Sequence, residues 1–171
     1  MGARSTKDGL DVCDHGPSNA YHIPLEIAEA RLPLLYKRLE LWTDSGGAGT
    51  WRGGLGFEGD VKWLSGEAMF TLTFERLKYR PFGVEGGEAA PVCRCELQHA
   101  DGRIEHLYGK GQVDMNAGDS LRYWSTGGGG YGDPLKRSPE RVAQDVLDGR
   151  VSPDEAHLSY GVVLVGEQVA A

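Results

Sequence analysis

Two cysteines and a histidine come nearest to a metal site in this sequence. Cys93 and Cys95 are separated by one residue, and His99 follows four residues later. In a β-strand, residues two apart point to the same face, so both thiols can reach one ion. A structural zinc site has two ligand pairs, however, and free cysteines are often buried as small apolar residues. We therefore expect that the chain binds no metal. Cys93, Cys95 and His99 are the candidate ligands for the alternative in which it does.

A second polar group lies between residues 19 and 26. His22 and Glu26 are four residues apart, a spacing that places two side chains on one face of a helix. With Asn19 they form a polar cluster at a predicted junction of loop and helix. Because histidine titrates near neutral pH, the cluster can serve general acid–base chemistry. The alternative is an exposed capping network. The sequence contains no G-x-S-x-G or H-E-x-x-H motif that would complete a catalytic site.

The chain has three glycine-rich segments, and the first of them contains the remaining candidates, Asp44 and Arg52. The chain has 26 glycines in 171 residues, concentrated at 44–56, 81–87 and 125–134. Glycine has no Cβ and lets other backbone approach closely, so we expect tight turns and backbone crossings. The segments lack the lysine and hydroxyl of a phosphate-binding loop, and no βαβ unit follows the first. Arg52 can bind a carboxylate or phosphate, or pair with an acid across an interface.

Composition narrows the class of protein. The chain is 40% hydrophobic and 25% charged, which is typical of one soluble globular domain. A net charge of −7 argues against a nucleic-acid partner, since phosphate contacts need clustered lysine and arginine. We find no apolar run long enough to span a membrane, no secretory signal, and only three cysteines. These features predict a cytoplasmic protein without a membrane partner.

Hydrophobic periodicity and turn signals predict a mainly β chain. Pro24 and Pro33 bound a short helix, and residues 38–43 alternate as a strand does. Two hairpins are expected, one joining 57–64 to 68–75 and the other joining 92–99 to 104–108. A further turn at 116–119 separates two more strand-like runs. The expected fold class is α+β, mainly β, as an antiparallel meander, sandwich or partial barrel.

The C-terminal segment changes character. Ser138-Pro139 and Ser152-Pro153 each place a capping serine before a proline at the first helical position. Gly149 and Gly161 end the two helices. We therefore divide the chain into a polar segment at 1–20, a glycine-rich β domain at 21–135, and a two-helix docking segment at 136–171. The helical pair is expected to dock on a neighbouring domain or subunit.

Three segments together resemble the C-terminal part of the hydantoinase B/oxoprolinase family. They are RLELWTDSGGAGTWRGGLG at 38–56, PFGVEGGEAA at 81–90, and the long motif at 118–164. The resemblance extends over about residues 15–165. A weaker match at 19–26 differs from the family pattern at Ala20 and His22, where relatives have threonine and asparagine.

The resemblance implies an ATP-dependent enzyme. Members of the family pair with an ATP-binding hydantoinase A-type subunit, and the two subunits together hydrolyse cyclic amides such as 5-oxoproline. A related branch, the acetone and acetophenone carboxylases, carboxylates ketones. Complete members are several times longer, and their N-terminal part holds metal ligands. The resemblance therefore implies that this chain is a small subunit that binds no cofactor itself. ATP and a divalent metal would lie on a hydantoinase A-type partner and a longer hydantoinase B-type chain.

Five residues are the candidates for contact with substrate or a partner: Asn19, His22, Glu26, Asp44 and Arg52. None of them is assigned a catalytic role. Two other functions remain open. The chain can be a non-catalytic subunit that only supports assembly, or a small metal-binding module that uses Cys93 and Cys95.

Overall fold

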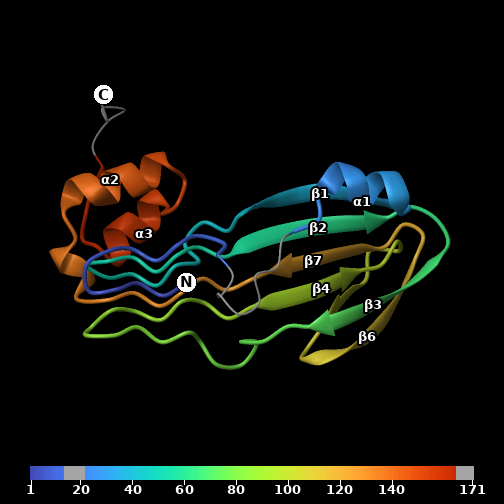
Figure 1. Ribbon diagram of the computed structural model, residues 1–171, viewed down its shortest axis with the longest axis horizontal. Coiled ribbons are helices and arrows are strands. Elements are labelled where there is room, and N and C mark those ends of the chain that lie inside the picture. The colour runs from blue at the N-terminus through green and yellow to red at the C-terminus, as the bar shows by residue number, and fades with distance from the viewer. Residues whose placement is uncertain (14–21, 165–171) are drawn as a thin grey trace.

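The computed structural model describes residues 1–13 and 22–164. The described chain is mainly β with a few short helices, as predicted (Figure 1). Its elements in order are α1 (Leu25–Arg31), β1 (Leu34–Leu41), β2 (Phe57–Trp63), β3 (Glu67–Thr73), β4 (Arg94–Gln98), β5 (Ile104–His106), β6 (Lys110–Asn116), β7 (Ser120–Trp124), the 3-10 helix η1 (Pro134–Lys136), α2 (Pro139–Leu147) and α3 (Pro153–Leu158). None of the helices in these residues is long and apolar enough to cross a membrane.

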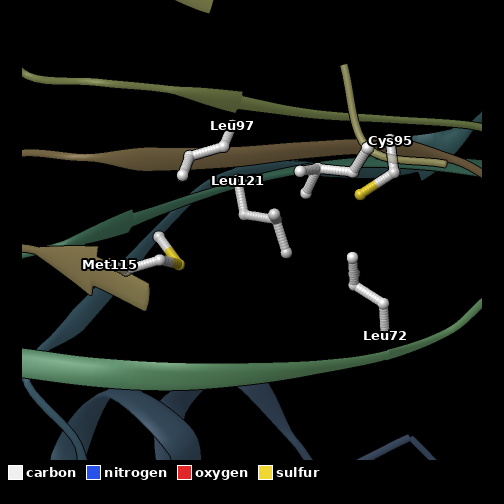
Figure 2. Close-up of a cluster of buried hydrophobic side chains, with 6 residues drawn as sticks. Leu72, Cys95, Leu97, Met115 and Leu121 are labelled. Atoms are coloured by element: carbon white, nitrogen blue, oxygen red, sulfur yellow. The ribbon is translucent and has the colours of Figure 1, made fainter. Parts of the chain in front are cut away.

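The strands form two antiparallel sheets that share one core. The larger sheet has the order β1-β2-β7-β4-β5, and β3 pairs with β6 in a separate ribbon. Leu72 and Met115 of the ribbon pack against Cys95, Leu97 and Leu121 of the larger sheet (Figure 2). Along β4 the side chains alternate between this core and the outer face, which is the period of two expected of a half-buried strand. Of the three predicted arrangements, meander, sandwich and partial barrel, the two packed sheets match the sandwich, and the larger sheet is not closed into a barrel.

The predicted hairpin between residues 57–64 and 68–75 is wrong. Strand β2 pairs with β1 and β7, whereas β3 pairs with β6 in the other sheet. The turn after β2 reverses the chain, with Gly66 at a φ of 71°, but it carries β3 across to the second sheet. Turn residues predict that the chain reverses direction. They do not predict which strand the next segment pairs with, because strand pairing depends on partners distant in sequence.

Other local predictions are confirmed. The helix lies between Pro24 and Pro33, because proline fits a helix start and the residue before a proline is disfavoured in the α region. The strand predicted at 38–43 is β1, which begins earlier, at Leu34, and ends at Leu41. The second hairpin, β4 with β5, has the predicted turn, and Glu96 lies opposite His106.

Extended segments rich in glycine lie beyond one end of the strands and run side by side toward α2 and α3 (Figure 1). We call residues 1–12, 44–56, 81–90 and 125–132 the glycine bundle. Backbone hydrogen bonds join them: Gly47 donates to the Gly128 carbonyl at 2.9 Å, and Gly54 donates to the Met1 carbonyl at 2.8 Å. A Cβ on Gly53 would lie 1.9 Å from the Gly128 carbonyl oxygen. Glycine is required here because backbone packs directly on backbone.

The two predicted C-terminal helices are confirmed and pack on the glycine bundle of the same chain. Ser152 accepts a hydrogen bond from the Glu155 backbone N–H at 3.1 Å, and Ser138 caps α2 in the same way. A second apolar cluster joins them to the bundle through Ala48, Val142, Val151, Ala156 and Tyr160.

Candidate functional site

Arg52, which the sequence placed among the substrate- or interface-facing candidates, lies at the centre of the glycine bundle. It is only 1% exposed. Its Nη1 donates to the Gly53 carbonyl at 2.6 Å and lies 3.4 Å from an Asp11 oxygen. Its Nε lies 3.5 Å from an Asp145 oxygen. Carboxylates of the same chain therefore partner the guanidinium, and the bundle separates it from solvent.

Arg52 belongs to a group of charged side chains that joins three distant parts of the chain. This arginine–aspartate network consists of Asp8, Asp11, Arg52, Arg137, Arg141, Asp145 and Arg150. Arg137 forms a two-pronged contact with Asp8, at 2.8 and 3.0 Å, and also donates to Asp145 at 2.7 Å. Removing one partner of a buried pair is strongly destabilising, because it leaves the other charge uncompensated. The network therefore joins residues 1–12 to Arg52 within the glycine bundle, and joins both to the helical segment at Arg137 and Asp145.

Electrostatics within the network keep Asp8 and Arg137 charged. Burial raises the pKa of Asp8, but the hydrogen bond and charge of Arg137 outweigh this effect and hold that pKa below its ordinary value. Burial also lowers the pKa of Arg137, yet Asp8 and Asp145 raise it above the usual value for arginine. Burial raises the pKa of Tyr160, which is 4% exposed and remains neutral. None of these three groups is set to exchange a proton near neutral pH.

Asp44 lies next to the start of α3. Its carboxylate accepts a hydrogen bond from the Ser152 backbone N–H at 2.7 Å, and its own N–H donates to the Arg150 carbonyl at 3.1 Å. Its φ of 63° lies in the left-handed region, which aspartate tolerates better than most residues. Asp44 therefore holds the connection between α2 and α3 against the first glycine-rich segment.

His22 and Glu26 lie near the opposite end of the molecule, beside β1 (Figure 1). Both are exposed. His22 precedes α1, so the prediction that it shares a helix face with Glu26 is wrong; the helix begins only at Leu25. The His22 ring packs edge-on against Tyr36 at 6.2 Å, and its Nδ1 lies 2.8 Å from the Ile23 carbonyl. Asn19 lies outside the described residues. The described candidates therefore do not converge on one site.

The candidate metal ligands also lie apart. Cys95 points into the core between the sheets (Figure 2), and burial raises its pKa to about 12. Burial raises the pKa of Cys93 as well, and its sulfur accepts the Thr126 backbone N–H at 3.2 Å. His99, past the far end of β4, contacts Glu105 and Asp119. Within 1–13 and 22–164, no three His, Cys, Asp or Glu side chains gather as metal ligands.

One concave site has no counterpart among the sequence predictions. A cavity of about 650 Å³, which we call the cationic cavity, lies where the chain leaves β3 and enters β6. It is lined by Phe74, Glu75, Arg76, Leu77, Lys78, Tyr79, Gly109 and Lys110. Lys110 forms an ion pair with Glu75 at 2.5 Å. The sequence holds no local signal for this cavity, because only the pairing of β3 with β6 brings residues 74–79 to residues 109–110.

Comparison with known proteins identifies relatives over almost the whole chain. Residues 1–134 match the sequence model of the family described as hydantoinase B/oxoprolinase. The chain is 34% identical to the beta chain of the caprolactamase of Pseudomonas jessenii, an alignment that covers 96% of this chain and 29% of that protein. It is 31% identical to a D-/L-hydantoinase component of the B type from Pseudomonas sp. strain NS671, over 98% of this chain and 28% of that protein. The chain thus spans less than a third of the length of these relatives.

Two solved structures share the fold. The ATP-dependent caprolactamase from Pseudomonas jessenii matches with a TM-score of 0.81 and 34% identity, over 96% of this chain and 30% of that one. A nucleotide-free acetone carboxylase matches with a TM-score of 0.80 and 24% identity, over 95% of this chain and 26% of that one. At 24% identity, the second match establishes a common fold only.

Proposed function

This chain belongs to the hydantoinase B/oxoprolinase family, and from this membership we propose that it works as a small subunit of a split, ATP-dependent enzyme. The observation that carries the proposal is its 34% identity to a caprolactamase subunit over 96% of this chain. We propose cyclic-amide hydrolysis as the reaction. Ketone carboxylation of the acetone or acetophenone type is the second candidate, because the resemblance of the motifs at 38–56, 81–90 and 118–164 includes that branch of the family.

We place the ATP and divalent-metal sites of this enzyme on two partner chains, a hydantoinase A-type ATP-binding subunit and a longer hydantoinase B-type chain. The present chain corresponds to about 29% of the caprolactamase subunit, so most of that subunit's length has no counterpart among the residues described here. The burial of Cys93 and Cys95 supports placing the metal site on another chain. Burial raises the pKa of Cys93 and Cys95, which disfavours the thiolate that a metal binds.

Within such an enzyme, the described residues divide into two roles. Asp44 and Arg52 hold the helices and the glycine bundle together through contacts inside this chain. His22 and Glu26 are exposed and available to substrate or to a partner. A purely structural subunit is the rival function, and the burial of Arg52 favours it.

Reconstitution tests the proposal. The chain is co-expressed with the hydantoinase A-type and longer hydantoinase B-type proteins of its host, and native mass spectrometry identifies the complex. ATP hydrolysis is then measured with caprolactam, 5-oxoproline and hydantoin, and separately with bicarbonate and acetone. A complex with turnover that requires this chain is the expected result. Failure to associate with either protein would overturn the proposal.

Two histidine variants separate catalysis from assembly. His22→Ala is compared with His157→Ala, which removes an exposed histidine of α3 at the other end of the molecule. Loss of turnover in His22→Ala alone, with the complex intact, would support a direct contribution of His22 to catalysis. Unchanged turnover in both would favour the structural role. Arg52→Ala does not discriminate, because it removes a buried charge that the fold requires.

The metal-binding alternative has its own test. Metal content is measured in the purified protein and in the variant that carries both Cys93→Ser and Cys95→Ser. A stoichiometric metal that is absent from the variant would support the alternative. Equal, substoichiometric metal in both proteins would exclude these two cysteines as its ligands.

A further inference from the structure

We infer that the cationic cavity is a docking site for an acidic segment of a partner protein, which inserts an apolar side chain between the cations. The inference rests on the proposed function, because the two partner chains named above are the proteins expected to supply this segment. The site lies on the loops that follow β3 and precede β6, and none of its lining residues belongs to the arginine–aspartate network.

Charge is the first argument. The whole chain carries a net charge of −7, yet three cations and a single carboxylate line the cavity. Glu75 is already paired with Lys110. Within the described residues, Arg76 and Lys78 have no carboxylate within 4.0 Å. A positive patch on an acidic chain attracts and orients an acidic partner, while the remaining surface repels it.

The apolar lining is the second argument. Tyr79 is 70% exposed at the cavity, and Tyr108, beside the lining residue Gly109, is 83% exposed. Phe74 extends from the cavity wall into the core, where its ring lies 6.3 Å from that of Tyr123. Exposed tyrosine and arginine are the residues enriched at the energetic centres of protein interfaces. A small oxyanion would pair with the cations but leave these aromatic surfaces in water.

The backbone at Arg76 is anchored to the segment that precedes β4. Arg76 has a φ of 60°, in the left-handed region that a non-glycine residue rarely adopts. Its carbonyl accepts a hydrogen bond from the Cys93 N–H at 3.0 Å, which anchors the segment to the start of β4. A hydrogen bond that already fixes the backbone at Arg76 reduces the conformational entropy that the segment loses when a partner binds.

Charge reversal tests the inference. The double variant Arg76→Glu with Lys78→Glu is titrated against each purified partner chain, beside wild type and a control with the same change in charge, Arg103→Glu with Lys136→Glu. Both control residues are exposed and lie outside the cavity. We expect the cavity variant to lose affinity by about 100-fold and the control to stay within about threefold of wild type. Tyr79→Ala should weaken binding without changing its salt dependence. Far-UV circular dichroism checks that each variant is folded.

The outcomes are distinct. If wild type binds a partner and the cavity variant binds equally well, the inference is overturned and the proposed function stands. Equal losses in the cavity variant and the control would also overturn it, because the effect would then be general charge. If wild type binds neither chain, both the proposed function and the inference fail. A homodimer that disappears in the cavity variant, or stabilisation of the free chain by inorganic phosphate at this site, would assign another occupant and overturn the inference.

Discussion

Gly53 has no room for a methyl group. A Cβ there would lie 1.9 Å from the Gly128 carbonyl oxygen and 2.6 Å from its carbon, so two backbones would have to separate. We expect Gly53→Ala to lower the free energy of unfolding by about 3 kcal/mol, at the upper end of ordinary overpacking. Urea unfolding measures the change.

Gly111→Ala is the matched control for this glycine. Gly111 lies in β6, and a Cβ built there meets no atom within 4 Å. Its replacement should leave stability unchanged or raise it by a few tenths of a kcal/mol, since alanine restricts the unfolded chain. Equal losses in the two variants would contradict close backbone packing as the cause.

Asp8 should make stability depend on acid pH. Its folded-state pKa lies below the ordinary value because the favourable contacts with Arg137 and Arg141 exceed the cost of burial. Its contribution is therefore fully present above the unfolded pKa of about 3.9 and is lost as the pH falls through the lower folded value. Urea midpoints measured from about pH 6 to pH 2 should fall less steeply in Asp8→Asn than in wild type. If the urea midpoints of Asp8→Asn and wild type fall equally with pH, Asp8 is not the cause of the acid dependence of stability.

At the scale of the element, the caps of α2 and α3 show how local sequence specifies a helix. Ser152 accepts the Glu155 N–H at 3.1 Å, and Pro153 occupies the first helical position. We expect Ser152→Ala to cost about 1 kcal/mol, because an N–H at the helix start loses its acceptor. Thermal unfolding followed by circular dichroism measures the loss. Ser65→Ala, in the exposed turn after β2, should differ from wild type by less than about 0.5 kcal/mol.

Strands are less predictable than these helices. The alternation of residues 68–75 correctly indicates a strand, and the turn before it is also correct. The predicted partner is wrong, because β3 pairs with β6, a strand far along the chain, and not with β2. Helix caps act over three or four residues, whereas strand pairing is decided by contacts between distant segments.

For the whole molecule, removal of residues 133–171 tests whether the helical pair only docks or also holds the fold. The deletion removes Arg137 and Asp145, so Asp8 loses its two-pronged partner and the buried Arg52 loses a carboxylate. Breaking a buried pair costs about 3–5 kcal/mol, against a typical total stability of about 5–15 kcal/mol. We expect the shortened chain to show no cooperative thermal unfolding by circular dichroism.

A chain that ends at Val162 is the control for this truncation, because it keeps α2, α3 and the network. It should unfold cooperatively, near the wild-type temperature. A cooperative transition in the shorter chain would mean that the helices are dispensable for the fold. In that case, loss of complex formation on truncation would report docking alone.

The sequence alone carries the local features and the family resemblance. Glycine blocks, serine caps, the β4–β5 turn and the alternation of strands are short-range patterns, and each sets backbone conformation where it occurs. Each of the family motifs, at 38–56, 81–90 and 118–164, is also continuous in the sequence, so it can be recognised without a structure.

Tertiary structure alone decides what the charged residues do. The sequence predicts Arg52 as a residue for substrate or an interface, yet its partners Asp11 and Asp145 come from the two ends of the chain. The cationic cavity likewise exists only because β3 lies beside β6. A sequence pattern records neighbours along the chain, whereas burial and ion pairing depend on neighbours in space. The roles of Arg52 and of the cavity therefore become visible only in the folded molecule.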